Sequence, residues 1–296
     1  MYNFYSDKIF QDIADLKKYE PINLSVDFNR QKFKLNGILI NNEITFGIYS
    51  PFWLPDFLFV KDRDNRLYEK VIEKIVDFKL KKKNKKIFIK LAPNIYNENI
   101  DFFKKFLIKY GFKIEKTFIQ SYLDLKRFKD KDEYIRQLSS SSKNNINYFK
   151  KKLKIKEISN KDILKIKSSY KIIAKNREIK KRKLKYNFRY LLKLIEKFND
   201  KIKIYSLFDD KKIIAASICH ETFPEYVYIA NWGDFHDYKK NINYFFYSEM
   251  LEIFLKEKYK ILDFGIACEL NEKDSGLLKF KKNLRNNFLK NEIFSL

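Results

Sequence analysis

An aspartate lies in the middle of an apolar segment near the C-terminus, at position 263 of KILDFGIA (260–267). A buried strand rarely carries a carboxylate that has neither a partner nor a task. One interpretation is that Asp263 accepts a hydrogen bond from an amine substrate or orients a basic residue. The other is that it pairs with a nearby Lys or Arg, or caps the turn at Gly265. Gly265 in turn indicates either a close approach of the backbone to a ligand or simple turn geometry.

Two basic segments are candidates for binding an anion. Asn176 and Arg177 lie in AKNREIKK, and an arginine can bind a carboxylate or a phosphate through two parallel hydrogen bonds. Lys239, Lys240 and Asn241 precede a predicted helix, and a helix N-terminus with basic flanks is a suitable anion site. The alternatives are a solvated basic helix face for the first segment and a polar loop with an asparagine cap for the second.

Length and charge limit the classes of protein to consider. The 296 residues predict one large domain or two ordinary ones, and 45% hydrophobic residues are enough for a core. The net charge of +25, from 63 Lys and Arg against 38 Asp and Glu, indicates an acidic partner such as a nucleic acid, an acidic carrier protein, a phosphorylated substrate or an anionic membrane surface. The same charge is also what a composition rich in Lys, Asn, Ile, Phe and Tyr gives, so both interpretations stay open.

Several functional classes lack their signatures in this sequence. There is no Gly-x-Gly pair for a Gly-rich nucleotide site, and the Asp-Phe-Gly triplet occurs without the other protein-kinase motifs. Two histidines (220 and 236) and two cysteines (219 and 268) without CxxC spacing predict no metal and a reducing compartment, with Cys219 as a buried small hydrophobe. No segment resembles a signal peptide or a membrane span, so we expect a cytoplasmic protein.

The hydrophobic pattern predicts a mixed α/β chain. The expected strands lie at 33–50 (a hairpin turning at Asn41-Asn42), 85–92, 113–125, 202–209, 211–221, 225–233 and 260–267. The expected helices lie at 65–83, 97–112, 132–152, 161–180, 185–198 and 242–259, with a last short helix or turn at 276–284. A polar segment at 126–133 places the expected domain boundary, which gives domains 1–130 and 131–296.

Three stretches in the second half carry a family resemblance. The order of strand YVYIAN, long helix, strand YKILDFGIA and GLLKFKKNL resembles the C-terminal half of FemABX-like proteins, which are tandem-GNAT acyltransferases with the pattern YDFGG…GLYRFKKGF. QLSSSSKNNINYFKKK is similar to their helix beginning LSKKARRNIRKA, and AKNREIKK is similar to an ENR segment of related chains. The positions that match the first pattern are Asp263, Phe264, Gly265, Gly276, Leu277, Phe280, Lys281 and Lys282.

The resemblance implies two GNAT-like domains, each a mixed sheet flanked by helices, with a degenerate first domain and the acyl-donor site in the second. The donor would lie between two splayed parallel strands, 225–231 and 260–266, with Asn231 and Gly265 beside it. An amine would attack the acyl carbon while a backbone N–H holds the oxyanion. Lys281 would meet a phosphate of the donor or bring positive charge to the reacting ester.

The resemblance also implies the reactants. The donor would be an acyl-CoA or an aminoacyl-tRNA, with no metal, and the acceptor an amine on a small molecule or a cell-envelope precursor. A tRNA or an acidic acyl carrier would then be a partner. The GNAT pyrophosphate loop is missing, because its place is taken by NWGDFHDYKKNINYF, and this leaves the donor open.

Two non-catalytic functions compete with the transferase. Aromatic residues beside lysines, as in NYFKKK, could stack on bases and contact phosphates, which is typical of a nucleic-acid-binding protein with a steep salt dependence. A degenerate GNAT pair could also serve only as a scaffold.

Overall fold

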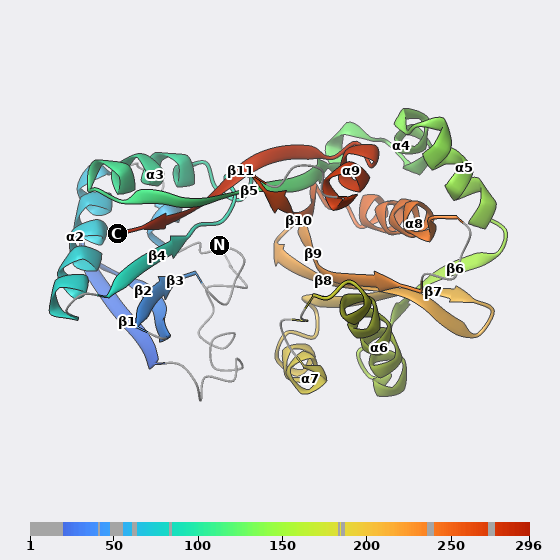
Figure 1. Cartoon of the computed structure of the whole chain (residues 1–296), viewed down its shortest axis with the longest axis horizontal. Coiled ribbons are helices and arrows are strands. Elements are labelled where there is room, and N and C mark those ends of the chain that lie inside the picture. Colours follow the sequence, from blue (N-terminus) through green and yellow to red (C-terminus); the bar gives the residue numbers. More distant parts are fainter. Residues whose placement is uncertain are drawn as a thin grey trace. The chain divides into compact units, whose positions relative to one another are not determined.

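The computed structural model describes residues 20–40, 42–47, 56–60, 64–82, 85–182, 184, 187–235, 240–271 and 276–296 (Figure 1). The chain divides into two compact units. The first takes residues up to Gln120 together with 269–271 and 289–296, and the second takes 121–268 and 272–288. Residues 1–19 and 48–55 are among those outside the described residues.

In its described residues, the first unit is a mixed sheet with two α-helices. Its elements are β1 (Glu20–Phe28), β2 (Gln31–Ile40), β3 (Glu43–Phe46), a 3-10 helix (Asp56–Phe59), α2 (Asn65–Lys81), β4 (Lys86–Lys90), α3 (Asn99–Lys109), most of β5 (Lys113–Asp124) and most of β11 (Asn287–Ser295). The strand order is β1-β2-β3-β4-β11-β5. β3 and β4 are parallel, whereas β2 is antiparallel to both β1 and β3, which confirms the predicted hairpin; Asn41 itself is outside the described residues.

Local signals in the sequence explain where these elements turn and end. Asn29 and Arg30 have φ of 47° and 63°, the left-handed pair that a tight β-hairpin requires. The Asn97 side chain accepts the N–H of Asn99 at 2.8 Å, so it satisfies an N-terminal donor of α3. Gly111, with φ of 84°, follows the end of that helix.

The second unit carries the segments that resemble FemABX-like proteins. Its elements are η3 (Leu125–Arg127), α4 (Lys131–Gln137), α5 (Ser140–Phe149), β6 (Leu153–Ile158), α6 (Ile163–Ile179), α7 (Phe188–Lys197), β7 (Ile202–Asp209), β8 (Lys212–Phe223), β9 (Tyr226–Asp234), α8 (Ile242–Lys256), β10 (Ile261–Glu269) and α9 (Gly276–Asn283). The strand order, starting from the end of β5, is β5-β10-β9-β8-β7-β6. β9 and β10 are parallel, and β6 to β9 are antiparallel neighbours.

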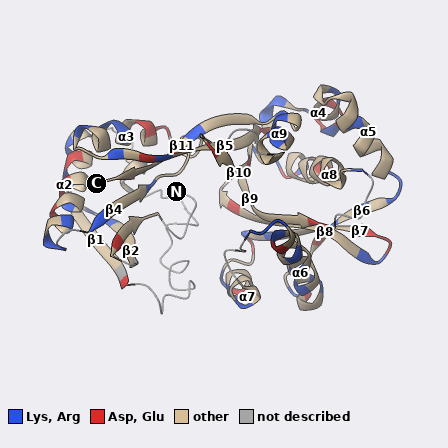
Figure 2. Cartoon of the chain, in the orientation of Figure 1, with Lys and Arg blue, Asp and Glu red and all other residues tan. Residues whose placement is uncertain are grey.

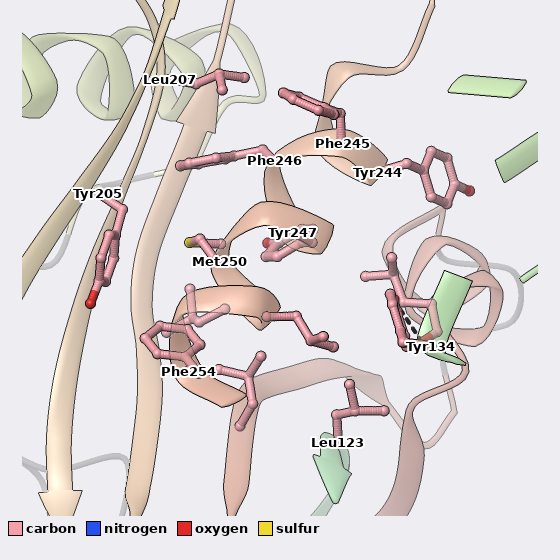
Figure 3. Packing of buried hydrophobic residues seen from close by; sticks show 14 of the residues in the cluster. Leu123, Tyr134, Tyr205, Leu207, Tyr244, Phe245, Phe246, Tyr247, Met250 and Phe254 are labelled. Atoms are coloured by element: carbon pink, nitrogen blue, oxygen red, sulfur yellow. Dashed lines mark hydrogen bonds between the residues drawn. The ribbon is translucent and has the colours of Figure 1, made fainter. Parts of the chain in front are cut away.

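Helix α8 forms the centre of the core of this unit. Phe246, Met250 and Phe254 of α8 are completely buried, and the ring of Phe254 meets that of Tyr205 on β7 edge-on at 5.4 Å (Figure 3). The Tyr134 hydroxyl of α4 donates to the carbonyl of Leu284 at 3.2 Å and so ties α4 to the end of α9. Helix α8 covers one face of the sheet, and helix α6 packs on the other face, against β8 and β9 (Figure 1).

Several elements differ from those expected from the sequence. The single helix expected at 132–152 is two helices, because Leu138 is extended and Ser139 caps α5 by accepting the N–H of Ser142. Strands β1, β6 and β11 were not predicted. Within the described residues, no helix is long and apolar enough to cross a membrane.

A glycine on β9 permits the close packing of α6. A Cβ built on Gly233 would lie 2.8 Å from both Asn176 Cβ and Ile173 Cα. We therefore expect Gly233→Ala to lower the free energy of unfolding by about 1–3 kcal/mol, because backbone atoms of α6 would have to move. Urea denaturation measures this. Gly276→Ala is the matched control, since a Cβ there meets nothing within 4 Å, and an equal loss in both variants would contradict the packing argument.

Candidate active site

The parallel strands β9 and β10 pair over only three residues. Each strand is nine residues long, but the pairing runs from Ile261 opposite Tyr226 to Asp263 opposite Tyr228. Beyond Asp263 the two strands no longer share a ladder. Asp263 therefore lies where the strands part, as the predicted donor site requires.

β9 has an irregularity just past this point. Cys219 of β8 pairs with Ile229, but its neighbour Ile218 pairs with Asn231, so Ala230 is an extra residue in β9. Such bulges redirect the backbone and often occur next to active sites. Asn231, predicted to lie beside the donor, is buried directly after the bulge.

Asp263 and Gly265 form a turn inside β10. Asp263 is completely buried, and its Oδ1 accepts the N–H of Gly265 at 2.7 Å. Gly265 has φ of +70°, and a Cβ there would lie 3.2 Å from Cε2 of Tyr228. The turn-cap interpretation of Asp263 is therefore correct for one carboxylate oxygen. Gly265 combines turn geometry with close contact to a side chain.

The ammonium of Lys281 binds the same turn from α9. Its Nζ donates to the carbonyls of Phe264 (2.7 Å), Gly265 (2.9 Å) and Ile266 (3.0 Å). Lys281 is 2% exposed, and this burial lowers its pKa to about 7, although the negative charge of Asp263 acts in the opposite direction. The lysine predicted to meet the donor is thus bonded to the strand that carries Asp263.

Arg177 brings positive charge to the same region from α6. Burial raises the pKa of Tyr228, Asp263 raises it further, and the charge of Arg177 opposes the rise. Arg177 has the same opposing effect on Tyr247, whose pKa burial raises strongly, and it helps to lower the pKa of Lys281. Arg177 therefore acts on residues of β9, α8 and α9 at once.

Asn176, the neighbour of Arg177, is engaged in a buried network. Its Nδ2 donates to the main-chain oxygen of Asp234 at 3.0 Å and to Oδ1 of Asp234 at 2.8 Å. Asn243 Nδ2 donates to Oδ2 of the same carboxylate at 3.2 Å. This network fastens α6 and the first turn of α8 to the end of β9.

The N-terminus of α8, the second predicted anion site, already has protein partners. Asn241 is its cap and accepts the N–H of Asn243 at 3.0 Å, while the N–H of Asn241 donates to Oδ1 of Asn145 at 2.9 Å. The buried carboxylate of Asp234 lies beside this turn through its bond to Asn243. Lys240 is exposed, and Lys239 lies outside the described residues.

Aromatic side chains cluster where α8 and α9 meet the two strands. Trp232 of β9 stacks on Phe280 of α9 at 5.8 Å, and Tyr247 of α8 contacts Phe280 at 5.7 Å and Phe264 of β10 at 5.2 Å. The ammonium of Lys180 lies 5.3 Å from the centre of the Trp232 ring. The partly exposed Trp232 thus has Phe280 and a cation as neighbours.

Neither His220 nor Cys219 is suited to acid–base or nucleophilic chemistry. Burial lowers the pKa of His220 to about 3 and raises that of Cys219 to about 12. Cys219 is fully buried, as the sequence predicted.

The second unit thus gathers Asp263, Gly265, Asn231, Lys281 and Arg177 around the parting of β9 and β10. Sequence reasoning missed three contributors: Tyr228, Lys180 and Asp234. Tyr228 lies between the apolar residues Val227 and Ile229 in YVYIAN, and this alternation was one available signal. The roles of Asp234 and Lys180 depend on contacts with partners more than 50 residues away, for which the sequence has no local signal.

Known proteins with a similar structure identify the fold that carries this arrangement. No protein-family profile and no curated protein matches the chain. Among solved structures, FemX is similar over 97% of this chain and 90% of its own, with 10% identity and a TM-score of 0.70. The fold is FemABX/GNAT-like.

Two further structures agree with this fold. L-PGS from Bacillus licheniformis is similar over 97% of this chain and 90% of its own, with 10% identity and a TM-score of 0.63. A tandem GNAT protein from the clavulanic acid biosynthesis pathway covers 98% of this chain, matches over 87% of its own length and is 8% identical, with a TM-score of 0.53. The predicted fold class is therefore confirmed.

The buried contacts of Asn176 predict a structural effect. We expect Asn176→Ala to lower the free energy of unfolding by about 1–3 kcal/mol, because Asp234 loses two bonds while it stays buried. Asn147→Ala on an exposed position of α5 is the control in urea denaturation. Unchanged stability together with weakened substrate binding would instead make Asn176 the substrate contact that the sequence predicted.

Proposed function

We propose that the protein is an acyltransferase that moves an acyl or aminoacyl group from a thioester or a tRNA ester to an amine. The observation that carries this proposal is the parting of β9 and β10 directly after the pair Asp263–Tyr228, next to the bulge at Ala230. Two parallel strands that separate no longer pair with each other through their backbone groups, so an extended acyl chain can pair with them instead. The FemABX/GNAT-like fold supports this reading.

In the proposed reaction the donor carbonyl lies beside the bulged segment of β9. The amine nitrogen attacks the acyl carbon, and a backbone N–H near Ala230 and Asn231 stabilises the oxyanion. The C–S or C–O bond to the carrier then breaks. Asp263 holds the attacking amine and accepts its proton, which returns through water to the leaving thiolate or alkoxide, so that charge balances over the cycle.

Positive charge around this region supports a substrate with a phosphate or carboxylate. Burial lowers the pKa of Lys180, and the charges of Arg177 and Arg182 lower it further. These three cationic side chains are therefore close enough to influence one another. Arg177 and Arg182 also act on Lys281. A guanidinium can bind such an anion in a bidentate manner, and we assign this role to Arg177.

The start of α8 favours one class of donor over the other. A negative charge is stabilised near a helix N-terminus, and Asp234 already supplies one there. A CoA pyrophosphate at Asn241 and Lys240 would meet that carboxylate. We therefore propose an aminoacyl ester of tRNA as the donor and an amine of a small molecule or cell-envelope precursor as the acceptor.

A non-catalytic nucleic-acid-binding protein is the second candidate. Lys167, Lys171 and Lys175 are exposed and spaced by four residues, so they share one face of α6. Lys and Arg also occur on helices and strands of both units (Figure 2). This candidate requires strongly salt-dependent binding without any transfer.

A panel of acyl-CoAs and charged tRNAs separates these functions. Each compound is incubated with the protein and its effect on thermal stability is recorded, because a ligand that binds the native state raises the melting temperature. Donors that protect are then tested for loss of the acyl group with and without amines. Amine-dependent loss supports the transferase. Protection by charged and uncharged tRNA alike, without loss of the acyl group, supports the second candidate.

A further inference from the structure

We propose that Lys281 is a positioning residue that keeps β10 apart from β9, and that it does not bind the donor. Its predicted effect on turnover rests on the proposed function, whereas its effect on the backbone does not. The inference begins with the three carbonyls that its ammonium binds.

These carbonyls belong to consecutive residues at the place where the ladder stops. Successive carbonyls of a regular strand point to opposite sides, so three of them cannot meet one ammonium while the strand stays regular. The positive φ of Gly265 makes the strand irregular at this point, and the Asp263 carboxylate accepts the N–H of Gly265. Lys281 then donates hydrogen bonds to the carbonyls of residues 264–266, a segment of β10 that is no longer paired with β9.

All three N–H groups of the Lys281 ammonium have a hydrogen-bond acceptor. A protonated lysine has three N–H groups and no acceptor, and Lys281 has three carbonyl partners at 2.7–3.0 Å. A phosphate could bind it only by displacing a buried carbonyl. Three acceptors also favour the charged form, because a neutral amine would direct a lone pair at one of the oxygens.

Helix α9 contacts both separated strands. Lys281 binds the backbone of β10, and the preceding residue, Phe280, stacks on Trp232 of β9 at 5.8 Å. One short helix thus fixes both sides of the parting. Lys281 is the contact on the side that carries Asp263, and its loss would release the turn that holds the carboxylate.

The first test compares Lys281→Met with Lys282→Met, its exposed neighbour on α9. For Lys281→Met we expect amide hydrogen exchange across residues 264–267 to quicken at least tenfold relative to the rest of the second unit. We also expect kcat to fall at least tenfold, while the Kd for a mixed pool of charged tRNA stays within twofold. Lys282→Met should change none of these values.

Two results for Lys281→Met would contradict the positioning role, and the first of them would identify a donor contact instead. A Kd raised tenfold or more with unchanged exchange at 264–267 would overturn the positioning role. Unchanged exchange together with unchanged kcat would overturn it as well. If the wild-type protein transfers nothing, the proposed function fails, but the exchange result still decides the role of Lys281.

A second variant covers the case in which Lys281→Met does not fold. Gly265→Ala keeps the lysine and its charge but places a Cβ 3.2 Å from the Tyr228 ring at a φ of +70°. We expect faster exchange at 264–267 and a lower kcat with unchanged Kd. Wild-type exchange and turnover in this variant would show that the turn does not need to be held, which would overturn the inference.

Discussion

Replacing Asp263 with Asn should lower turnover about 100-fold or more while the protein stays folded. The asparagine side-chain oxygen can still accept the N–H of Gly265, which Asp263 binds at 2.7 Å, so the turn survives. The amide has no negative charge and cannot accept the proton of an amine. Loss of a positioned acid–base group typically reduces rates by about 10²–10⁴-fold. Steady-state kinetics with the donor selected by the panel, together with urea denaturation, measures both effects.

Two further variants show whether the loss of turnover is due to the charge of Asp263. Asp209→Asn, at the exposed end of β7, should behave as the wild type. Asp263→Ala removes the turn cap as well as the charge and should lose stability in addition to turnover. Full activity in Asp263→Asn would reduce Asp263 to a turn cap and remove the catalytic assignment.

Replacing Arg177 with Gln should raise KM for the anionic substrate at least tenfold, with a smaller effect on kcat. Arg177 is the cation whose charge reaches Tyr228, Tyr247 and Lys281 together, so its loss removes a charge shared by the whole region. Hydrogen bonds to charged groups contribute about 1.5–3 kcal/mol, which corresponds to a change of this size. KM measured at several salt concentrations should depend less on salt in the variant than in the wild type.

The control lies on the same helix. Lys167→Gln removes an exposed charge near the other end of α6 and should leave KM unchanged at moderate salt. If Lys167→Gln and Arg177→Gln raise KM equally, binding depends on the general positive charge of the protein. The nucleic-acid-binding alternative would then gain support.

The buried carboxylate and the irregular strand where β9 and β10 separate could be predicted because their sequence signals are local. An aspartate inside an apolar run, followed two residues later by a glycine, indicates a buried carboxylate and an irregular strand. Asp263 and Gly265 have these properties. The position of Lys281 followed from the resemblance, but its partners did not, because three backbone carbonyls 15–17 residues earlier leave no mark in a sequence.

Other features depend on contacts that cannot be read from neighbouring residues. Asn176 was predicted, together with Arg177, to contact substrate, but its bond to Asp234, 58 residues later, could not be read from the sequence. Strand β6 was missed because lysines interrupt LKIKEI, a pattern that suits the edge position it occupies beside β7. The bulge at Ala230 arises from the register between β8 and β9, which alternation alone does not fix.

The site itself is tested most directly by a crystal structure with a non-hydrolysable aminoacyl-ester analogue. The account predicts that the acyl carbonyl lies between β9 and β10, within hydrogen-bond distance of a backbone N–H at Ala230 or Asn231, with the acceptor side open toward Asp263. An analogue that binds elsewhere, with Trp232, Tyr247 and Phe264 filling the space between the strands, would contradict it.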